Sequence, residues 1–426
     1  MSATSGTKTV QLSASPQGES IEIEGFHARV VDHCADTIAR FAQQRAAFSL
    51  ATAPETEIRI GHQRDAILSL QGNGGSHISA WWQRSVDSGD PWKVWAVIFV
   101  LGELGDVASR GRIRGALELL PDDDEDRWAV AAEALGLVSL PDPVALGHDL
   151  WSSPSAVSQA VGLDLLARLG ALTIDLLRDG INHPEPAVMA SAARATVRTG
   201  AVRELAPELT DCLDVPSRAV AWEAARALTI AGLSAAYFYL REDRKLASTL
   251  GPLGIEILTM AGDDLDIGRC ETLIAETPVT APVLSAVGRF GNVTAWSFLL
   301  HYLADPALVE ATVYALRTLF GDLVPGADVT SFPAWKEAIA EADFNPVLRY
   351  RRGKPWSPST VLAECASGTL SRGEVERRLD ELASRLGAGP SVDLALWGPD
   401  AKRQLAVFDT DALARGAGWR PGAWRA

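Results

Sequence analysis

The chain has 426 residues, 47 % of them hydrophobic, and its 39 lysines and arginines stand against 54 aspartates and glutamates, which gives a formal net charge of −15. This charge repels phosphate backbones and anionic lipid surfaces, so it argues against general binding to nucleic acid or to membranes. The four cysteines are widely spaced and form no CxxC pair, which predicts reduced thiols in a cytoplasmic protein rather than a disulfide framework or a zinc site.

The N-terminal part predicts a tail followed by helices. Residues 1–20 are polar and rich in Ser, Thr and Gly, and we expect them to be disordered. Apolar residues at helical spacing then predict helices over 26–50 and 56–70, within a helical N-terminal cap at 21–90. No apolar run in the chain approaches the roughly 20 residues that cross a bilayer, so no membrane contact is expected.

A helical unit occurs twice between residues 184 and 232. Eight residues recur in order 32 positions later, and in the first copy they are Pro184, Ala187, Val188, Ala192, Ala193, Arg194, Ala195 and Gly200. A proline opens each copy and a glycine closes it, as is typical of helix ends. Residues 204–213, between the copies, are long enough for only one more helix. The unit is therefore a helical hairpin of about 30 residues.

The same period runs through residues 91–322. Helices rich in alanine or leucine end at intervals of about 30 residues, at or near Gly105, Ser139, Gly170, Gly200, Gly232, Gly262, Gly291 and Gly321. A shorter helix is expected between successive ends, as at 144–151 and 172–181. This pattern predicts an all-α fold, an α-solenoid of short helical hairpins.

The tryptophans give more specific expectations. Trp95, Trp128 and Trp222 lie inside repeat helices and are expected mostly in the core, where large aromatic rings fill the space between hairpins. Trp81 and Trp82 are adjacent, and on a helix they would point about 100° apart. They cannot both face one core, so one is expected at solvent, at a partner or against the N-terminal helices.

The period stops at about residue 322, and residues 323–426 predict a separate helical C-terminal region. Ser357 followed by Pro358 is typical of a helix start. Ser371 and Glu374 have the spacing of a capping box. The helix that this box opens should bury a stripe made of Val375, Leu379, Leu382 and Leu386.

Two groups of residues are candidate protein-binding sites. The first is the main basic cluster of this acidic chain: Arg349, Tyr350, Arg351, Arg352, Lys354 and Trp356. It either clamps helix termini and the acidic end of the solenoid, or forms a docking surface for a protein or an anionic ligand. The second consists of polar positions on the alanine-rich helices, which usually line the concave side of such arrays: Glu133, Arg194, Arg198, Glu223 and Arg226. These residues either bind a partner, or are solvated or paired across adjacent repeats.

Motifs of catalysis are missing from the sequence. It contains no HExxH, GxSxG, P-loop, dinucleotide or EF-hand pattern, and its seven histidines are scattered. The acidic run at 122–126 fits a solvated loop before a helix better than a calcium site, because no glycine lies within it. We therefore expect no catalytic residue, no cofactor and no metal ion.

The repeats resemble short bacterial HEAT repeats of the phycobilisome-lyase type. The resemblance rests on helices that end in Leu-Gly, such as 131–136 (AAEALG) and 100–106 (VLGELGD). The Val-Arg pair usual in that family is absent, because Met189 follows Val188 and Ala221 follows Val220. Binding residues of the family are therefore not transferred to this chain.

A wider resemblance spans nearly the whole chain. Residues 60–64 (IGHQR), 70–72 (LQG), the short repeats and 349–356 (RYRRGKPW) are similar in order to an uncharacterised proteobacterial HEAT-like family. Genes of that family commonly lie beside genes for type VI secretion spike, tip and adaptor proteins. The resemblance implies a role in loading, handling or neutralising a secreted effector.

These observations predict a non-catalytic protein-binding scaffold, an adaptor or chaperone-like accessory factor for a type VI secretion effector. Its partner would be the effector, a spike protein, or both. One alternative is an immunity protein that binds an effector and occludes its active site. Another is a lyase-like enzyme built on related repeats, which would need a cysteine or a carboxylate in a pocket. Cys212 and Cys365 are the cysteines with charged neighbours.

Overall fold

The computed structural model describes residues 16–47, 53–70, 78, 81–105, 107–121, 125–138, 140–242, 244–251, 253–262, 266–276, 278–386, 394, 396 and 398–406. Within these ranges the chain is all-α, as predicted, apart from one hairpin of two short strands, β1 (Tyr350–Arg351) and β2 (Lys354–Pro355). None of the described helices combines the length and apolarity needed to cross a bilayer.

The N-terminal helices α1 (Pro16–Ala47) and α2 (Ala53–Ser69) pack against each other and against the first repeat helix. Helix α1 begins at Pro16, inside the stretch expected to be a disordered tail, and residues 1–15 lie outside the described part. Trp81 and Trp82 are only 3 % and 8 % exposed. Both belong to one core that includes residues of α1, so the expectation that they cannot both face one core is wrong. The N-terminal helices contribute to this core, and neither ring faces solvent.

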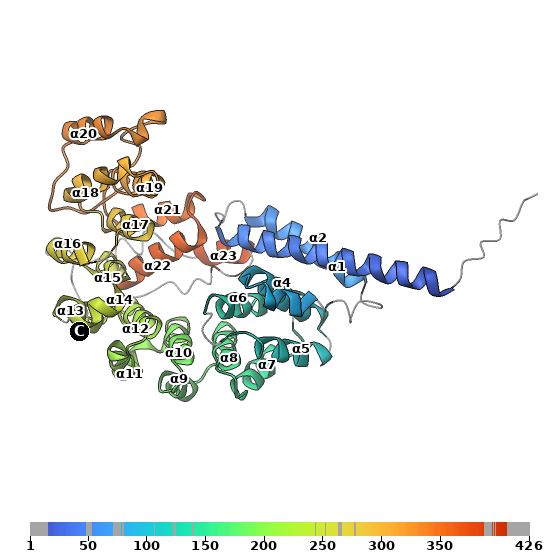
Figure 1. Cartoon of the computed structure of the whole chain (residues 1–426). Coiled ribbons are helices and arrows are strands. Elements are labelled where there is room, and N and C mark those ends of the chain that lie inside the picture. Colours follow the sequence, from blue (N-terminus) through green and yellow to red (C-terminus); the bar gives the residue numbers. More distant parts are fainter. Residues whose placement is uncertain are drawn as a thin grey trace, which may run out of the picture.

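Helical hairpins follow one another along the chain, and each has an inner and an outer helix (Figure 1). The inner helices are α4 (Pro91–Leu104), α6 (Glu125–Leu135), α8 (Ala156–Arg168), α10 (Pro186–Thr199), α12 (Arg218–Ile230), α15 (Leu253–Ala261), α17 (Ala281–Phe290) and α19 (Val309–Phe320). Each inner helix packs against the next one in this order. The row of inner helices is therefore continuous from α4 to α19.

The outer helices lie on the other side of this row (Figure 1). They are α5 (Val107–Leu117), α7 (Pro143–Trp151), α9 (Ile174–Ile181), α11 (Ala206–Asp211), α13 (Ala235–Glu242), α14 (Arg244–Leu250), α16 (Ile267–Glu276), α18 (Trp296–His301) and α20 (Phe332–Glu341). Short 3₁₀ turns complete several connections: η1 (Ala201–Arg203), η2 (Cys212–Asp214), η4 (Val293–Ala295), η5 (Tyr302–Ala304) and η6 (Gly326–Thr330).

Local signals in the sequence explain where these helices start and stop. Gly105, Gly200 and Gly291 follow α4, α10 and α17 with φ of 63°, 75° and 78°, the left-handed conformation that closes a helix. Trp95 and Trp128 are buried in the core as expected, whereas Trp222 is half-buried. Alanine-rich inner helices allow close packing between layers, and three apolar cores run between the hairpins.

The C-terminal helices α21 (Pro358–Ala366), α22 (Arg372–Leu386) and α23 (Gly398–Ala406) turn back into the curve of the inner helices (Figure 1). Ser357 caps α21 as predicted, since its hydroxyl accepts from the Thr360 amide. The predicted stripe is buried at Val375, Leu379 and Leu382. These residues join a fourth apolar core formed by the C-terminal helices themselves, which is separate from the cores of the repeats.

Candidate functional site

Helix α22 lies on the concave side of the repeats, against α12, α15 and α1 (Figure 1). We call the surface that it covers, formed by α6, α12, α15 and α17, the inner face. The apolar stripe of α22 does not touch this surface, because Val375, Leu379 and Leu382 pack with Trp356 and Val361 in the C-terminal core. The inner face is therefore met by the polar sides of the helix.

Ion pairs hold α22 on the inner face. The Arg226 guanidinium on α12 donates to the carboxylates of Asp380 at 2.7 Å and of Glu376 at 3.0 Å. On α17, Arg289 donates to Glu374 at 3.2 Å. Asp380 and Glu376 are one helical turn apart, so both reach one guanidinium from the same side of α22. At these points carboxylates of α22 meet arginines of the inner face, although α22 itself also carries arginines.

A further ion pair joins the start of α22 to α6. Arg372 donates to the Glu133 carboxylate at 2.9 Å, and Arg45 of α1 donates to the same carboxylate at 2.9 Å. Burial alone would raise the pKa of Glu133, but Arg372, Arg45 and Arg168 together outweigh burial and lower it. One predicted binding residue, Glu133, thus links the N-terminal helices, the repeats and α22.

The C-terminal end of α22 meets the end of α15. Arg385 donates to the carbonyl oxygens of Thr259 at 3.1 Å and Gly262 at 3.0 Å, and the Ser384 hydroxyl donates to Met260 at 2.9 Å. The last carbonyls of a helix have no partner within it and carry its partial negative charge, so a guanidinium is a favourable partner.

The structure places most of the basic cluster inside the molecule. Arg349, Tyr350, Arg351 and Trp356 are buried, whereas Arg352 and Lys354 are exposed. Arg349 donates to the carbonyls of Phe290 at 2.5 Å and Thr259 at 3.0 Å, at the ends of α17 and α15. In this structure Arg349, Tyr350 and Arg351 therefore clamp helix termini, the first of the two interpretations. The four buried residues form no docking surface.

The close approach of the strand hairpin requires glycine at two of the positions that end repeat helices, Gly291 and Gly321. The Tyr350 amide donates to the carbonyl of Gly291 at 2.7 Å, and the Arg352 amide donates to Thr318 at 2.8 Å. A Cβ on Gly291 would lie 2.6 Å from the Tyr350 oxygen, and one on Gly321 would lie 2.7 Å from the Arg352 oxygen. The glycines thus close the helices and also let the hairpin approach them.

Glu381 is the buried centre of this network. Its carboxylate accepts from Arg351 at 2.7 Å, from Arg349 at 3.3 Å and from the indole nitrogen of Trp356 at 2.8 Å. The Glu381 side chain is 1 % exposed. Burial lowers the pKa of Arg351, and the Glu381 carboxylate opposes that effect.

The remaining predicted residues pair between neighbouring hairpins. Arg194 on α10 donates to Glu223 on α12 at 3.0 Å, and Arg198 donates to Asp164 on α8 at 2.8 Å. Glu223 also lies 3.6 Å from Arg226. These pairs fit the expectation of ion pairs across adjacent repeats.

The sequence interpretation missed several residues of the α22 interface, among them Arg289, Arg372, Glu376, Asp380 and Arg385. One signal was available for Arg289. It stands two residues before the glycine that ends its helix, as Arg198 does before Gly200. The charges on α22 gave no such signal, since a charged helix face is ordinarily solvated.

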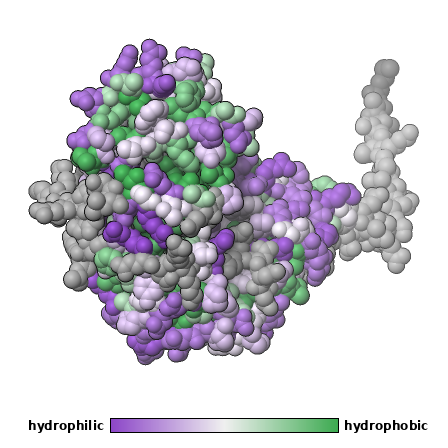
Figure 2. Space-filling view, turned by 60° about the vertical axis from the view of Figure 1, so that its left-hand side comes forward, coloured by the Kyte–Doolittle hydropathy of each residue, from purple (hydrophilic) through white to green (hydrophobic). Residues whose placement is uncertain are grey.

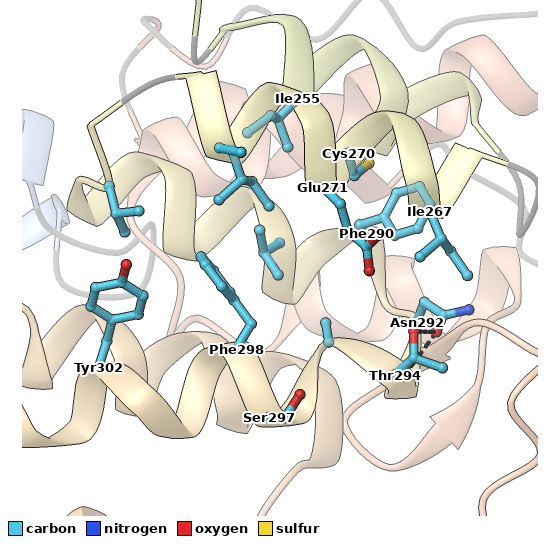
Figure 3. A pocket seen from close by; sticks show the side chains of 15 residues that line it. Ile255, Ile267, Cys270, Glu271, Phe290, Asn292, Thr294, Ser297, Phe298 and Tyr302 are labelled. Carbon is cyan, nitrogen blue, oxygen red and sulfur yellow. Dashed lines mark hydrogen bonds between the residues drawn. The ribbon is translucent and has the colours of Figure 1, made fainter.

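A second feature lies on the opposite side of the repeats, between the outer helices α16 and α18. It is a cleft of about 540 Å³ whose walls include Ile255, Phe290 and Phe298. Figure 3 shows Glu271 beside Phe290 at one end and Tyr302 at the other. Figure 2 shows apolar residues gathered on the upper part of this face, at the height of α16 to α20.

Acid should weaken the packing of α22 through Glu374. Burial would raise the pKa of Glu374, but Arg289, Arg378 and the Tyr314 hydroxyl outweigh it and lower the pKa from 4.5 to about 2. This carboxylate therefore stabilises the fold above its unfolded pKa, and the stabilisation is lost as the pH falls toward 2. Between pH 5 and pH 3 the loss is about 2 kcal/mol. Urea unfolding gives the free energy of unfolding at both pH values. Between pH 5 and pH 3 this free energy should fall by about 2 kcal/mol less in Glu374→Gln than in the wild type, because glutamine does not titrate. An equal fall in the two proteins would contradict the assignment.

The fold and the site define a class, a helical-repeat protein that holds one of its own helices on its inner face. Comparison of the chain with protein-family models and with curated proteins gave no match.

Proposed function

We propose that this chain is a non-catalytic scaffold that binds a helix of a partner protein on its inner face. One observation carries the proposal: the inner face already binds a helix, α22, through ion pairs to Arg226, Arg289 and Glu133. A polar contact between separate apolar cores is typical of parts that associate reversibly. A partner helix with carboxylates spaced like those of α22 would meet the same arginines and take its place.

We further propose that the partner is a type VI secretion effector or a spike protein that carries it. The resemblance of residues 60–64 and 349–356 to a family encoded beside such genes supports this assignment. An adaptor must hold and then release its cargo, and an internal helix that competes for the binding surface favours release. Because the partner can bind only molecules in which α22 has left the inner face, its apparent affinity is its intrinsic affinity multiplied by the fraction of such molecules.

The lyase-like alternative is less favoured by the chemistry of the thiols. Burial raises the pKa of Cys212 to about 11 and that of Cys365 to about 12. A protonated buried thiol is a poor nucleophile at neutral pH. The immunity alternative uses the same inner face and differs in what the complex does.

Affinity purification from the native host, with mass spectrometry of the bound proteins, tests the proposal. We expect wild-type protein to recover an effector or spike protein, and Asp380→Arg to recover more, because this change repels α22 from Arg226 but leaves the inner face intact. Protection of cells that express the effector would assign immunity, and recovery of both effector and spike without protection would assign an adaptor. Equal recovery by both proteins would contradict a role of the inner face.

A further inference from the structure

The cleft between α16 and α18 is separate from the inner face. Its floor comes from α15 and α17 through Ile255, Val287 and Phe290, and its sides come from the outer helices through Ile274 and Phe298. A volume of about 540 Å³ lies in the range of ligand-binding pockets, and a largely apolar lining with few polar groups is typical of them.

Three polar residues, Glu271, Asn292 and Thr294, lie together at one end of the cleft. Glu271 is exposed at one end and forms no ion pair within the part of the chain that the structure describes. At the same end the Asn292 side-chain oxygen already accepts from the Thr294 amide and hydroxyl, at 2.9 Å and 2.6 Å, as Figure 3 shows. Among the described residues that line the cleft, Glu271 is the only charged one, so the charge offered to a ligand is negative, in a chain whose net charge is −15.

We propose that the cleft binds a short segment of a partner protein that carries large apolar side chains next to a lysine or arginine. The apolar side chains would cover Phe290 and Phe298, and the basic group would reach Glu271. An acidic or phosphorylated segment would meet an unfavourable charge at the same place. The apolar surroundings of the cleft in Figure 2 extend the surface that such a segment would bury.

Two peptides test the proposal on the full chain: a blocked hexapeptide of leucine, phenylalanine and lysine, and the same peptide with glutamate in place of lysine. Calorimetry should detect binding of the lysine peptide. The glutamate peptide should bind more weakly or give no signal. Glu271→Gln should weaken the lysine peptide about two- to five-fold, the size expected of an exposed ion pair, and the preference should fade at high salt.

Ser297→Trp should weaken the lysine peptide about ten-fold or more, because Ser297 lies exposed on the cleft wall and an indole there would fill the space. Thr272→Trp is the matched control, because Thr272 is exposed on the same helix as Glu271 but does not line the cleft. Equal binding by the two tryptophan variants would overturn the proposal.

The neutral dye Nile red distinguishes a small-molecule site. Dye binding that is lost in Ser297→Trp, without binding of either peptide, would assign the cleft to a small apolar molecule and overturn the proposal. These measurements do not involve α22, so their failure would leave the proposed function of the inner face standing.

Discussion

Glu381→Gln is expected to lower the free energy of unfolding by about 3–5 kcal/mol, the cost of leaving buried charges without their partner. The carboxylate is the shared acceptor of Arg349, Arg351 and Trp356, and its side chain is buried. Glutamine keeps the shape and one acceptor oxygen but removes the negative charge. The buried guanidinium groups of Arg349 and Arg351 would then lose the negative charge that balances theirs.

Glu376→Gln on the same helix is the matched control. Its side chain is 56 % exposed, and it shares Arg226 with Asp380. Exposed pairs contribute about 0–1 kcal/mol, so this variant should unfold close to the wild type in urea. Equal losses in the two variants would show that Glu381 is not the centre of the buried network.

Ala224→Glu should be comparably damaging, with a loss of several kcal/mol or local unfolding of the repeat. Ala224 is 0 % exposed and lies on α12 within the core that joins the middle hairpins. A glutamate there has no basic partner in the apolar core and no room for its side chain. Because neighbouring hairpins share one core, the effect should spread beyond α12.

The control for this change is Ala129→Glu, which adds the same side chain at an exposed position of the inner helix α6. Surface substitutions usually change stability by less than about 0.5 kcal/mol. Thermal and urea unfolding should therefore separate the two variants clearly. An Ala224→Glu protein as stable as Ala129→Glu would mean that the buried face of α12 is assigned wrongly.

The repeats could be predicted from the sequence because their signals are local. Glycines such as Gly200 and Gly291 end helices, prolines begin them, and alanines at helical spacing define the buried side. The start of α22 was only half predicted. The Ser371 hydroxyl accepts from the Glu374 amide at 3.3 Å, but the Glu374 carboxylate accepts from Tyr314 and Arg378 instead of completing the capping box.

The inner-face site depends on contacts that no local pattern encodes. Arg372 and Glu133 are 239 positions apart in the chain, and they meet because the C-terminal helices turn back along the repeats. The basic cluster was compatible with two roles, since arginine suits helix ends as well as partners. The cleft had no signal in the sequence, because apolar residues such as Ile255 and Phe298 look the same whether they fill a core or line a cavity.

Hydrogen exchange of the α22 amides tests the central claim most directly, that ion pairs hold a displaceable helix on the inner face. Burial raises the pKa of Asp380 to about 6. The exchange should therefore be measured at about pH 8, where the Asp380 carboxylate is charged. We predict that Asp380→Arg speeds exchange in α22 about ten-fold or more while the inner helices keep their protection, and that the charge swap Arg226→Glu with Asp380→Arg restores slow exchange. Two results would contradict this claim. One is that Asp380→Arg leaves exchange in α22 unchanged, and the other is that exchange in α22 rises only together with exchange in the repeats.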